Sequence, residues 1–221
     1  MNFLRTQTLT RIADVLKLKL NGVLWKTQSN LNIIPGHGIS FTQTEVKDVS
    51  NLTISVGDAD GSIGYWGAFY DTTDQTIAST TTAYVVGLNS SGPNNDGVSV
   101  VDGSKVTVAN AGVYNIATSV QLTSTSVQIH DAWFWFRKNG VDLPDSCSQV
   151  SIPQSHGGNP GALLFYVNIM EKLNAGDYIQ LVWNANDTNV SLETIPAAVS
   201  PVRPRNPSVI LTVNQVLGAL A

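Results

Sequence analysis

The residue types that most often carry catalysis or bind metals are sparse in this chain. The three histidines and the one cysteine are scattered along the sequence: His37, His130, His156 and Cys147. Asp131 follows His130, but neighbouring strand residues point to opposite faces, so the two cannot pair as a base and its orienting carboxylate. Cys147 and His156 would form a nucleophile pair only if the fold brought them together, and no family signature flanks either one. We therefore expect no catalytic group at these positions.

Local motifs for phosphate, nucleophile and zinc sites are absent from the sequence. It contains no glycine-rich phosphate loop, no G-x-S-x-G elbow, no H-E-x-x-H and no C-x-x-C. Asp58-Ala-Asp60-Gly61 has the opening spacing of a calcium loop but lacks the later ligands, so we interpret it as a turn. We predict no metal, no cofactor and no enzyme activity, although paired carboxylates on separate strands, as in glycosidases, would leave no local signature.

A run of four aromatic residues offers a different chemistry. The segment Trp133-Phe-Trp-Phe136 could stack on sugar rings, or it could belong to a core and a subunit interface. Because side chains alternate across a strand, at most two of the four can line one open surface. We favour the core and interface interpretation.

Composition and charge narrow the class of protein. The chain has 221 residues, 43% hydrophobic and 13% charged, which excludes a disordered protein and predicts one main domain with an appendage. The net charge of −4 is too small to indicate nucleic-acid or general membrane binding. The single cysteine excludes an internal disulfide. Charges interrupt every apolar run near the N-terminus, so we expect no signal peptide, no membrane span and synthesis in a cytosol.

The charge is distributed unevenly. Residues 1–26 carry five basic side chains and one acidic side chain, a net +4, whereas residues 27–221 carry seven basic and fifteen acidic side chains, a net −8. Such a basic arm could lie on a membrane, but docking onto an acidic protein surface explains the same pattern, and we prefer docking. The candidate attachment residues are Arg5, Arg11, Lys17, Lys19 and Lys26.

Short alternating segments between Gly, Asn, Asp, Pro and Ser clusters predict an all-β sandwich or barrel. The turn-forming run Gly57–Gly64 marks a boundary before the main domain. Upstream of it, two strands are expected at 38–44 and 51–56, whereas residues 16–25 fit both an amphipathic helix and a β-hairpin. Ten strands are expected downstream: 65–70, 83–88, 97–101, 105–109, 113–122, 132–138, 162–169, 178–183, 190–194 and 208–216.

Two of these strands are apolar on both faces, and one is followed by a hairpin signal. The strands 132–136 and 161–169 carry apolar bulk on both faces, which indicates a second buried surface, such as another subunit. Asn139-Gly140 has the residue pair that a tight hairpin needs, because both central positions take positive φ.

From residue 65 onward, the order of motifs resembles the C1q/TNF-like globular domain in the version found in bacteriophage virion proteins. The residues that carry the resemblance are Trp66–Phe69, Gly103–Tyr114 with its G-x-Y signature, Phe136–Gly140 ending in K-N-G, Leu173–Ile179 with its L-x-x-G-D-x-I pattern, and Ser208–Val213. More loosely, Gly36–Phe41 and Leu52–Val56 are similar to a short β module that leads into the terminal domains of phage fibres and spikes.

The resemblance implies a ten-strand jelly-roll β-sandwich that forms a tight homotrimer and has no enzyme activity. We therefore expect an attachment arm at 1–30, a β module or connector at 31–60 and a jelly-roll domain at 61–221. The residues expected to contribute to the threefold contact are Tyr114, Phe165, Tyr166 and Tyr178.

The expected function is that of a noncatalytic virion structural protein made in the host cytoplasm. It would be a capsid decoration (cement) protein or short head fibre, bound through residues 1–60 to the major capsid protein or another virion protein. The alternative is a receptor-binding module at the tip of a tail fibre or spike. In that case the loops 153–161 and 88–97 would touch a host glycan or surface protein.

Overall fold

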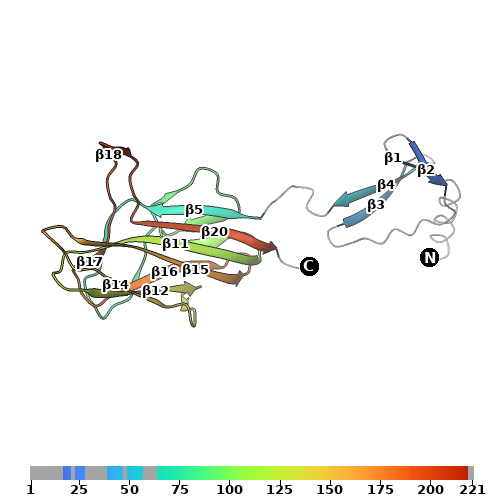
Figure 1. The fold of residues 1–221 in the computed structure, drawn as a ribbon. Helices are drawn as coiled ribbons and strands as arrows, with labels where there is room; N and C mark the ends of the chain where they lie inside the picture. The colour runs from blue at the N-terminus through green and yellow to red at the C-terminus, as the bar shows by residue number, and fades with distance from the viewer. Residues whose placement is uncertain (1–16, 21–22, 28–38, 47–48, 57–63, 219–221) are drawn as a thin grey trace. The chain divides into compact units, whose positions relative to one another are not determined.

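The computed structural model describes these parts of the chain: residues 17–20, 23–27, 39–46, 49–56 and 64–218, with side chains for 64–216. All regular elements in the described ranges are strands, so the all-β prediction is confirmed (Figure 1). In these ranges there is no helix long and apolar enough to cross a membrane. The chain divides into two compact units, Met1–Ser62 and Ile63–Ala221, which we describe separately.

The first unit contains two antiparallel hairpins. Strands β1 (Lys17–Leu20) and β2 (Val23–Thr27) pair antiparallel with each other. For these residues the hairpin alternative is therefore correct and the helical one is wrong. Strands β3 (Ile39–Val46) and β4 (Val49–Val56) pair in continuous register, which confirms the two strands expected there.

The second unit is a sandwich of two seven-stranded sheets. The first, which we call the β11 sheet, has the order β6-β17-β11-β20-β5-β8, with β15 paired to β11. Its long strands are β5 (Trp66–Asp71), β11 (Gly112–Ser124), β15 (Gly161–Leu173) and β20 (Val209–Gly218), and its short ones are β6 (Gln75–Thr76), β8 (Ser90–Ser91) and β17 (Val190–Leu192). The described pairs within this sheet are antiparallel.

The second sheet, which we call the β12 sheet, has the order β13-β12-β16-β10-β9, with β14 paired to β12 and β7 to β16. Its strands are β7 (Tyr84–Val85), β9 (Val98–Val101), β10 (Lys105–Val108), β12 (His130–Lys138), β13 (Val141–Asp142), β14 (Ser148–Ile152) and β16 (Tyr178–Ala185). A separate small hairpin joins β18 (Ala198–Val199) and β19 (Val202–Arg203).

Alternation along the strands builds the core between the two sheets. On β11 the even-numbered residues from Tyr114 to Leu122 are buried, and on β12 the buried residues are Ala132, Phe134 and Phe136. Phe134 of the β12 sheet stacks on Phe165 of the β11 sheet, with ring centroids 4.8 Å apart. These aromatic contacts join the two sheets through apolar area removed from water.

The expected strands of the second unit occur, with differences at their ends. The segment expected at 83–88 is a strand only over Tyr84–Val85. The strands that the sequence did not predict are β6, β8, β13, β14, β18 and β19. Asn139 and Gly140 have φ of 49° and 83°, which confirms the predicted hairpin turn.

The sandwich has two different ends. At one end, the described part of the unit begins at residue 64 and β20 ends beside it (Figure 1). There Gln215 N of β20 donates to Tyr65 O at 2.7 Å. The opposite end carries the connections 125–129, 153–160 and 193–208, the last of which contains the β18–β19 hairpin. Ser155 N donates to Ser126 O at 2.7 Å, so two of these connections are in contact.

Candidate functional site

An open groove lies on the outer face of the β12 sheet. The odd-numbered residues of β12 point away from the core, so Trp133 and Trp135 form the floor of the groove while Phe134 and Phe136 are buried. This outcome agrees with the expectation that at most two of the four aromatic residues share an open surface. Asn184 of β16 lies opposite Trp133 in the strand register and joins the floor.

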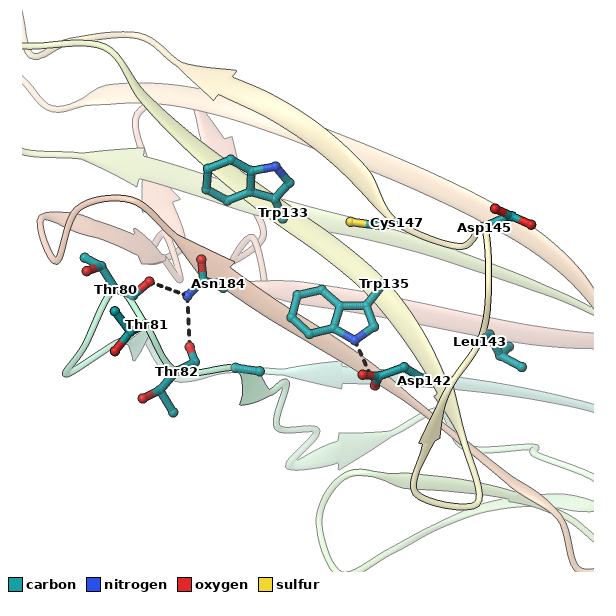
Figure 2. Close-up of a pocket in the computed structure, with 11 residues that line it drawn as sticks. Thr80, Thr81, Thr82, Trp133, Trp135, Asp142, Leu143, Asp145, Cys147 and Asn184 are labelled. Atoms are coloured by element: carbon teal, nitrogen blue, oxygen red, sulfur yellow. Dashed lines mark hydrogen bonds between the residues drawn. The ribbon is translucent and has the colours of Figure 1, made fainter.

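The walls of the groove come from two loops on either side of the floor (Figure 2). One wall is Thr80–Ala83, and the other contains Asp142, Leu143, Asp145 and Cys147. The space between them has a volume of about 590 Å³, which falls within the range of small-molecule sites.

Hydrogen bonds hold both walls in place. Asn184 Nδ2 donates to the carbonyl oxygens of Thr80 and Thr82, each at 2.9 Å, which ties the first loop to β16 (Figure 2). In the second wall, Ser146 Oγ donates to Leu143 O at 2.9 Å. Ser146 Oγ also accepts from Phe136 N at 3.1 Å. Both loops that wall the groove are therefore restrained by hydrogen bonds to the sheet or within the loop.

The charge in the groove is acidic. Asp142 Oδ1 accepts from Arg137 Nε at 2.8 Å and from Trp135 Nε1 at 2.9 Å. These two hydrogen bonds, first that from Arg137, lower the pKa of the Asp142 carboxyl. Asp145 accepts no hydrogen bond from the described residues. With Arg137 paired to Asp142, the carboxylate of Asp145 is not balanced by a cation lining the groove.

A second surface, the outer face of the β11 sheet, is apolar and almost uncharged. Along β15 the even-numbered side chains point outward, and Leu164, Tyr166 and Met170 are 59%, 63% and 66% exposed. Among the described strands, β15 pairs only with β11, over all 13 of its residues, so β15 forms a long edge. Long apolar edge strands are normally paired or covered.

The outward residues of β5, β20 and β11 continue this surface without charge. They are Trp66, Ala68 and Tyr70; Ile210, Thr212, Asn214 and Val216; and Val113, Asn115, Ala117, Ser119 and Gln121. Among the outward residues of these strands and β15, the one charged side chain in the described chain is Lys172, near one end. Asn168 Nδ2 donates to Asn115 Oδ1, so two of the polar groups satisfy each other. We call this surface the neutral face.

The four residues expected at a threefold contact lie in different places. Tyr166 is on the neutral face. Tyr114 is fully buried, and its hydroxyl donates to Asn110 O at 2.7 Å, while Phe165 is buried against Phe134. Tyr178 is half-buried on the other sheet, with the Lys105 Nζ 5.4 Å from its ring centroid. Strand alternation therefore places Tyr166 and its neighbour Phe165 on opposite sides of the same sheet.

The candidate attachment residues belong to the first unit. Lys17 and Lys19 lie in β1 and Lys26 lies in β2. Arg5 and Arg11 lie outside the described residues.

Among the described side chains, His130 lies near a serine and an aspartate, but the geometry does not match a catalytic triad. His130 Nε2 is 2.8 Å from Ser126 Oγ and 3.5 Å from Asp187 Oδ2. A triad needs the serine and the carboxylate on different ring nitrogens, so that one orients the ring while the other accepts the proton. Hydrogen bonds to Asp187, first from Asn189 N, lower the pKa of the Asp187 carboxyl.

The other residues considered for chemistry remain separate in the described structure. His156 lies in the exposed connection before β15, whereas Cys147 lines the groove. His37 and the Asp58–Asp60 turn lie outside the described residues. In the described part of the chain, no three His, Cys, Asp or Glu side chains lie close enough to hold a metal ion.

The sequence reasoning missed the walls of the groove. Thr80, Thr82, Asp142, Asp145 and Asn184 come from three separate segments, and none of them stands in a recognisable motif. The two tryptophans, at alternate positions of one strand, were the available signal.

Comparison with known proteins adds no family assignment. No protein-family model matches the chain, and no curated protein matches it either.

Proposed function

We propose that this protein is a noncatalytic virion structural protein that works as a homotrimer. The observation that carries the proposal is the neutral face, where apolar and uncharged polar side chains cover four adjacent strands and end at the long exposed edge of β15. Monomeric proteins rarely leave such a continuous surface in water. Packing against a second and a third copy of the chain around a threefold axis would cover this surface and would protect the β15 edge.

The threefold arrangement and the jelly-roll class rest on the sequence resemblance. Its motifs fall on β5, β10–β11, β12, β15–β16 and β20, which form most of the two sheets. The resemblance also supports a capsid decoration protein or short head fibre, bound through residues 1–60 to the major capsid protein or another virion protein. The basic arm supplies charge that suits an acidic shell.

The trimer is tested by placing a charge on the neutral face. Wild-type protein should have three times the 23.6 kDa mass of the chain in light scattering after gel filtration. Leu164→Glu should shift the mass to that of one chain, because a buried, unpaired carboxylate opposes association. The matched control, Val199→Glu, puts the same charge on the β18–β19 hairpin, outside the neutral face, and should stay trimeric. A wild-type mass of one chain would overturn the proposal.

A second candidate function is receptor binding at the tip of a tail fibre or spike. Exposed apolar side chains at the end of the sandwich opposite residue 64 favour it, namely Val127, Ile129, Val199 and Val202. Of the two loops suggested by the sequence, 153–160 lies at this end, whereas 88–97 runs beside β5, where Trp66 N donates to Asp96 O at 2.9 Å.

The two functions differ in copy number. Quantitative mass spectrometry of purified particles should give a number that matches the shell lattice if the protein decorates the capsid. A few trimers per particle would instead place it at the tail or at a unique vertex, and receptor binding would then become the leading function.

A further inference from the structure

We propose that the groove on the β12 sheet is a carbohydrate-binding site for an unbranched, uncharged chain of pyranose sugars. The site consists of Trp133 and Trp135 on the floor and of the polar groups of Asp142, Asp145 and Asn184 around it. The inference does not depend on the trimer, since the groove and the neutral face lie on the outer sides of different sheets.

The arrangement of the two indoles suits a chain of sugar rings. They stand two residues apart on one strand, which separates their backbone positions by about 7 Å. Figure 2 shows them side by side, each with its broad face in view, and neither covers the other. The two rings thus form an elongated apolar floor on which successive sugar rings can lie.

Trp135 and the two walls are held in place before any ligand binds. Trp135 is fixed by its hydrogen bond to Asp142, and the loops on both sides are tied to β16 and β12. A ligand therefore does not have to order these side chains, and this saves conformational entropy on binding.

Several hydrogen-bond acceptors around the floor have no donor among the described residues. In the described structure Asn184 uses its amide nitrogen on Thr80 and Thr82, whereas its side-chain oxygen takes no hydrogen bond. Asp145 and the second carboxylate oxygen of Asp142 also accept none from the described residues. These are acceptors around an apolar floor, and sugar hydroxyls are the donors that complement them.

The charge of the groove selects the class of sugar. The carboxylates of Asp142 and Asp145 would repel a uronic or sialic acid chain, and the guanidinium of Arg137 is already paired. A quaternary ammonium ligand would fit the charge, but it is normally enclosed by several aromatic walls. Here both aromatic rings lie on one open floor, which favours an extended neutral glycan.

The test is calorimetry of the full-length protein with cellohexaose, chitohexaose and maltohexaose. At least one of these should bind. Trp133→Ala and Trp135→Ala should each weaken binding about tenfold or more, which corresponds to about 1.4 kcal/mol, and Trp133→Phe should recover part of it by keeping an aromatic face. The matched control is Val141→Ala, an exposed apolar residue on β13 outside the groove, which should bind as wild type.

A second readout needs no variant. Cys147, the only cysteine of the chain, lines the groove and is exposed. The bound hexasaccharide should slow its alkylation by iodoacetamide, whereas polygalacturonate oligomers should not. The proposal is overturned if none of the three hexasaccharides binds at millimolar concentration, if both alanine variants bind as wild type, or if choline chloride protects Cys147 and the sugars do not.

Discussion

Phe134 shows how one side chain can hold the two sheets of this sandwich together. Its ring stacks on Phe165 of the opposite sheet, with 4.8 Å between centroids, and lies nearly parallel to Trp183 of its own sheet at 6.1 Å. All three side chains are buried. The cost of removing one of them therefore includes both lost burial and an unfilled cavity.

At the residue scale, we predict that Phe134→Ala lowers the free energy of unfolding by about 3–5 kcal/mol. Urea unfolding followed by tryptophan fluorescence measures the change. Val141→Ala, which shortens a side chain that is 70% exposed, is the control and should change stability little. An equal loss in both variants would contradict the role given to Phe134.

At the element scale, two turns at the same end of the sandwich are linked through Asp177. Its carboxylate accepts from Asn174 N at 2.8 Å within the β15–β16 turn. It also accepts from Asn139 Nδ2 at 2.8 Å in the β12–β13 turn, and Lys138 Nζ is 3.8 Å away. These contacts, first the hydrogen bond from Asn174 N, hold the pKa of the Asp177 carboxyl below its ordinary value of 3.8.

A lowered carboxyl pKa means that the folded state favours the ionised form. The stability that Asp177 contributes is therefore fully present above the ordinary pKa and is lost as pH falls through the lowered one. We predict that Asp177→Asn is less stable than wild type at about pH 7 and that the difference shrinks towards about pH 3. Urea midpoints across this range measure it. Asp96→Asn is the control, because the Asp96 side chain makes no hydrogen bond to described residues. If the loss of stability in Asp177→Asn stays constant across this pH range, the charge-based explanation is ruled out.

At the scale of the whole molecule, the proposed function places attachment and association in different parts of the chain. The net +4 of residues 1–26 and the net −8 of the remainder separate a basic arm from an acidic body. The neutral face that we assign to the trimer lies in the second unit. The two roles should therefore be separable by deletion.

We predict that removing residues 1–26 abolishes binding to virus particles and leaves the protein trimeric, with a mass three times that of the truncated chain. Co-sedimentation with particles and light scattering measure the two properties. Binding of the intact protein should also weaken as salt rises, because exposed charge contacts are screened within about 10 Å at 0.1 M salt. Undiminished binding of the truncated protein would place attachment elsewhere.

The sequence by itself determined the features that depend on neighbouring residues. Alternating apolar positions established the all-β class and most strands, and Asn139-Gly140 established a hairpin, because strand pleating and positive φ are local properties. Alternation also showed that Trp133 and Trp135 share one face of β12, before the identity of that face was known.

Only the tertiary structure decided which face of each strand is inside. Phe165 and Tyr166 are adjacent and similar in size, and the sequence does not distinguish them, yet Phe165 is in the core and Tyr166 is exposed. The groove likewise depends on Thr80, Asp142 and Asn184, which are far apart in the chain and meet because β7, β13 and β16 belong to one sheet. Which sheet covers which face is a property of long-range pairing, and no local pattern encodes it.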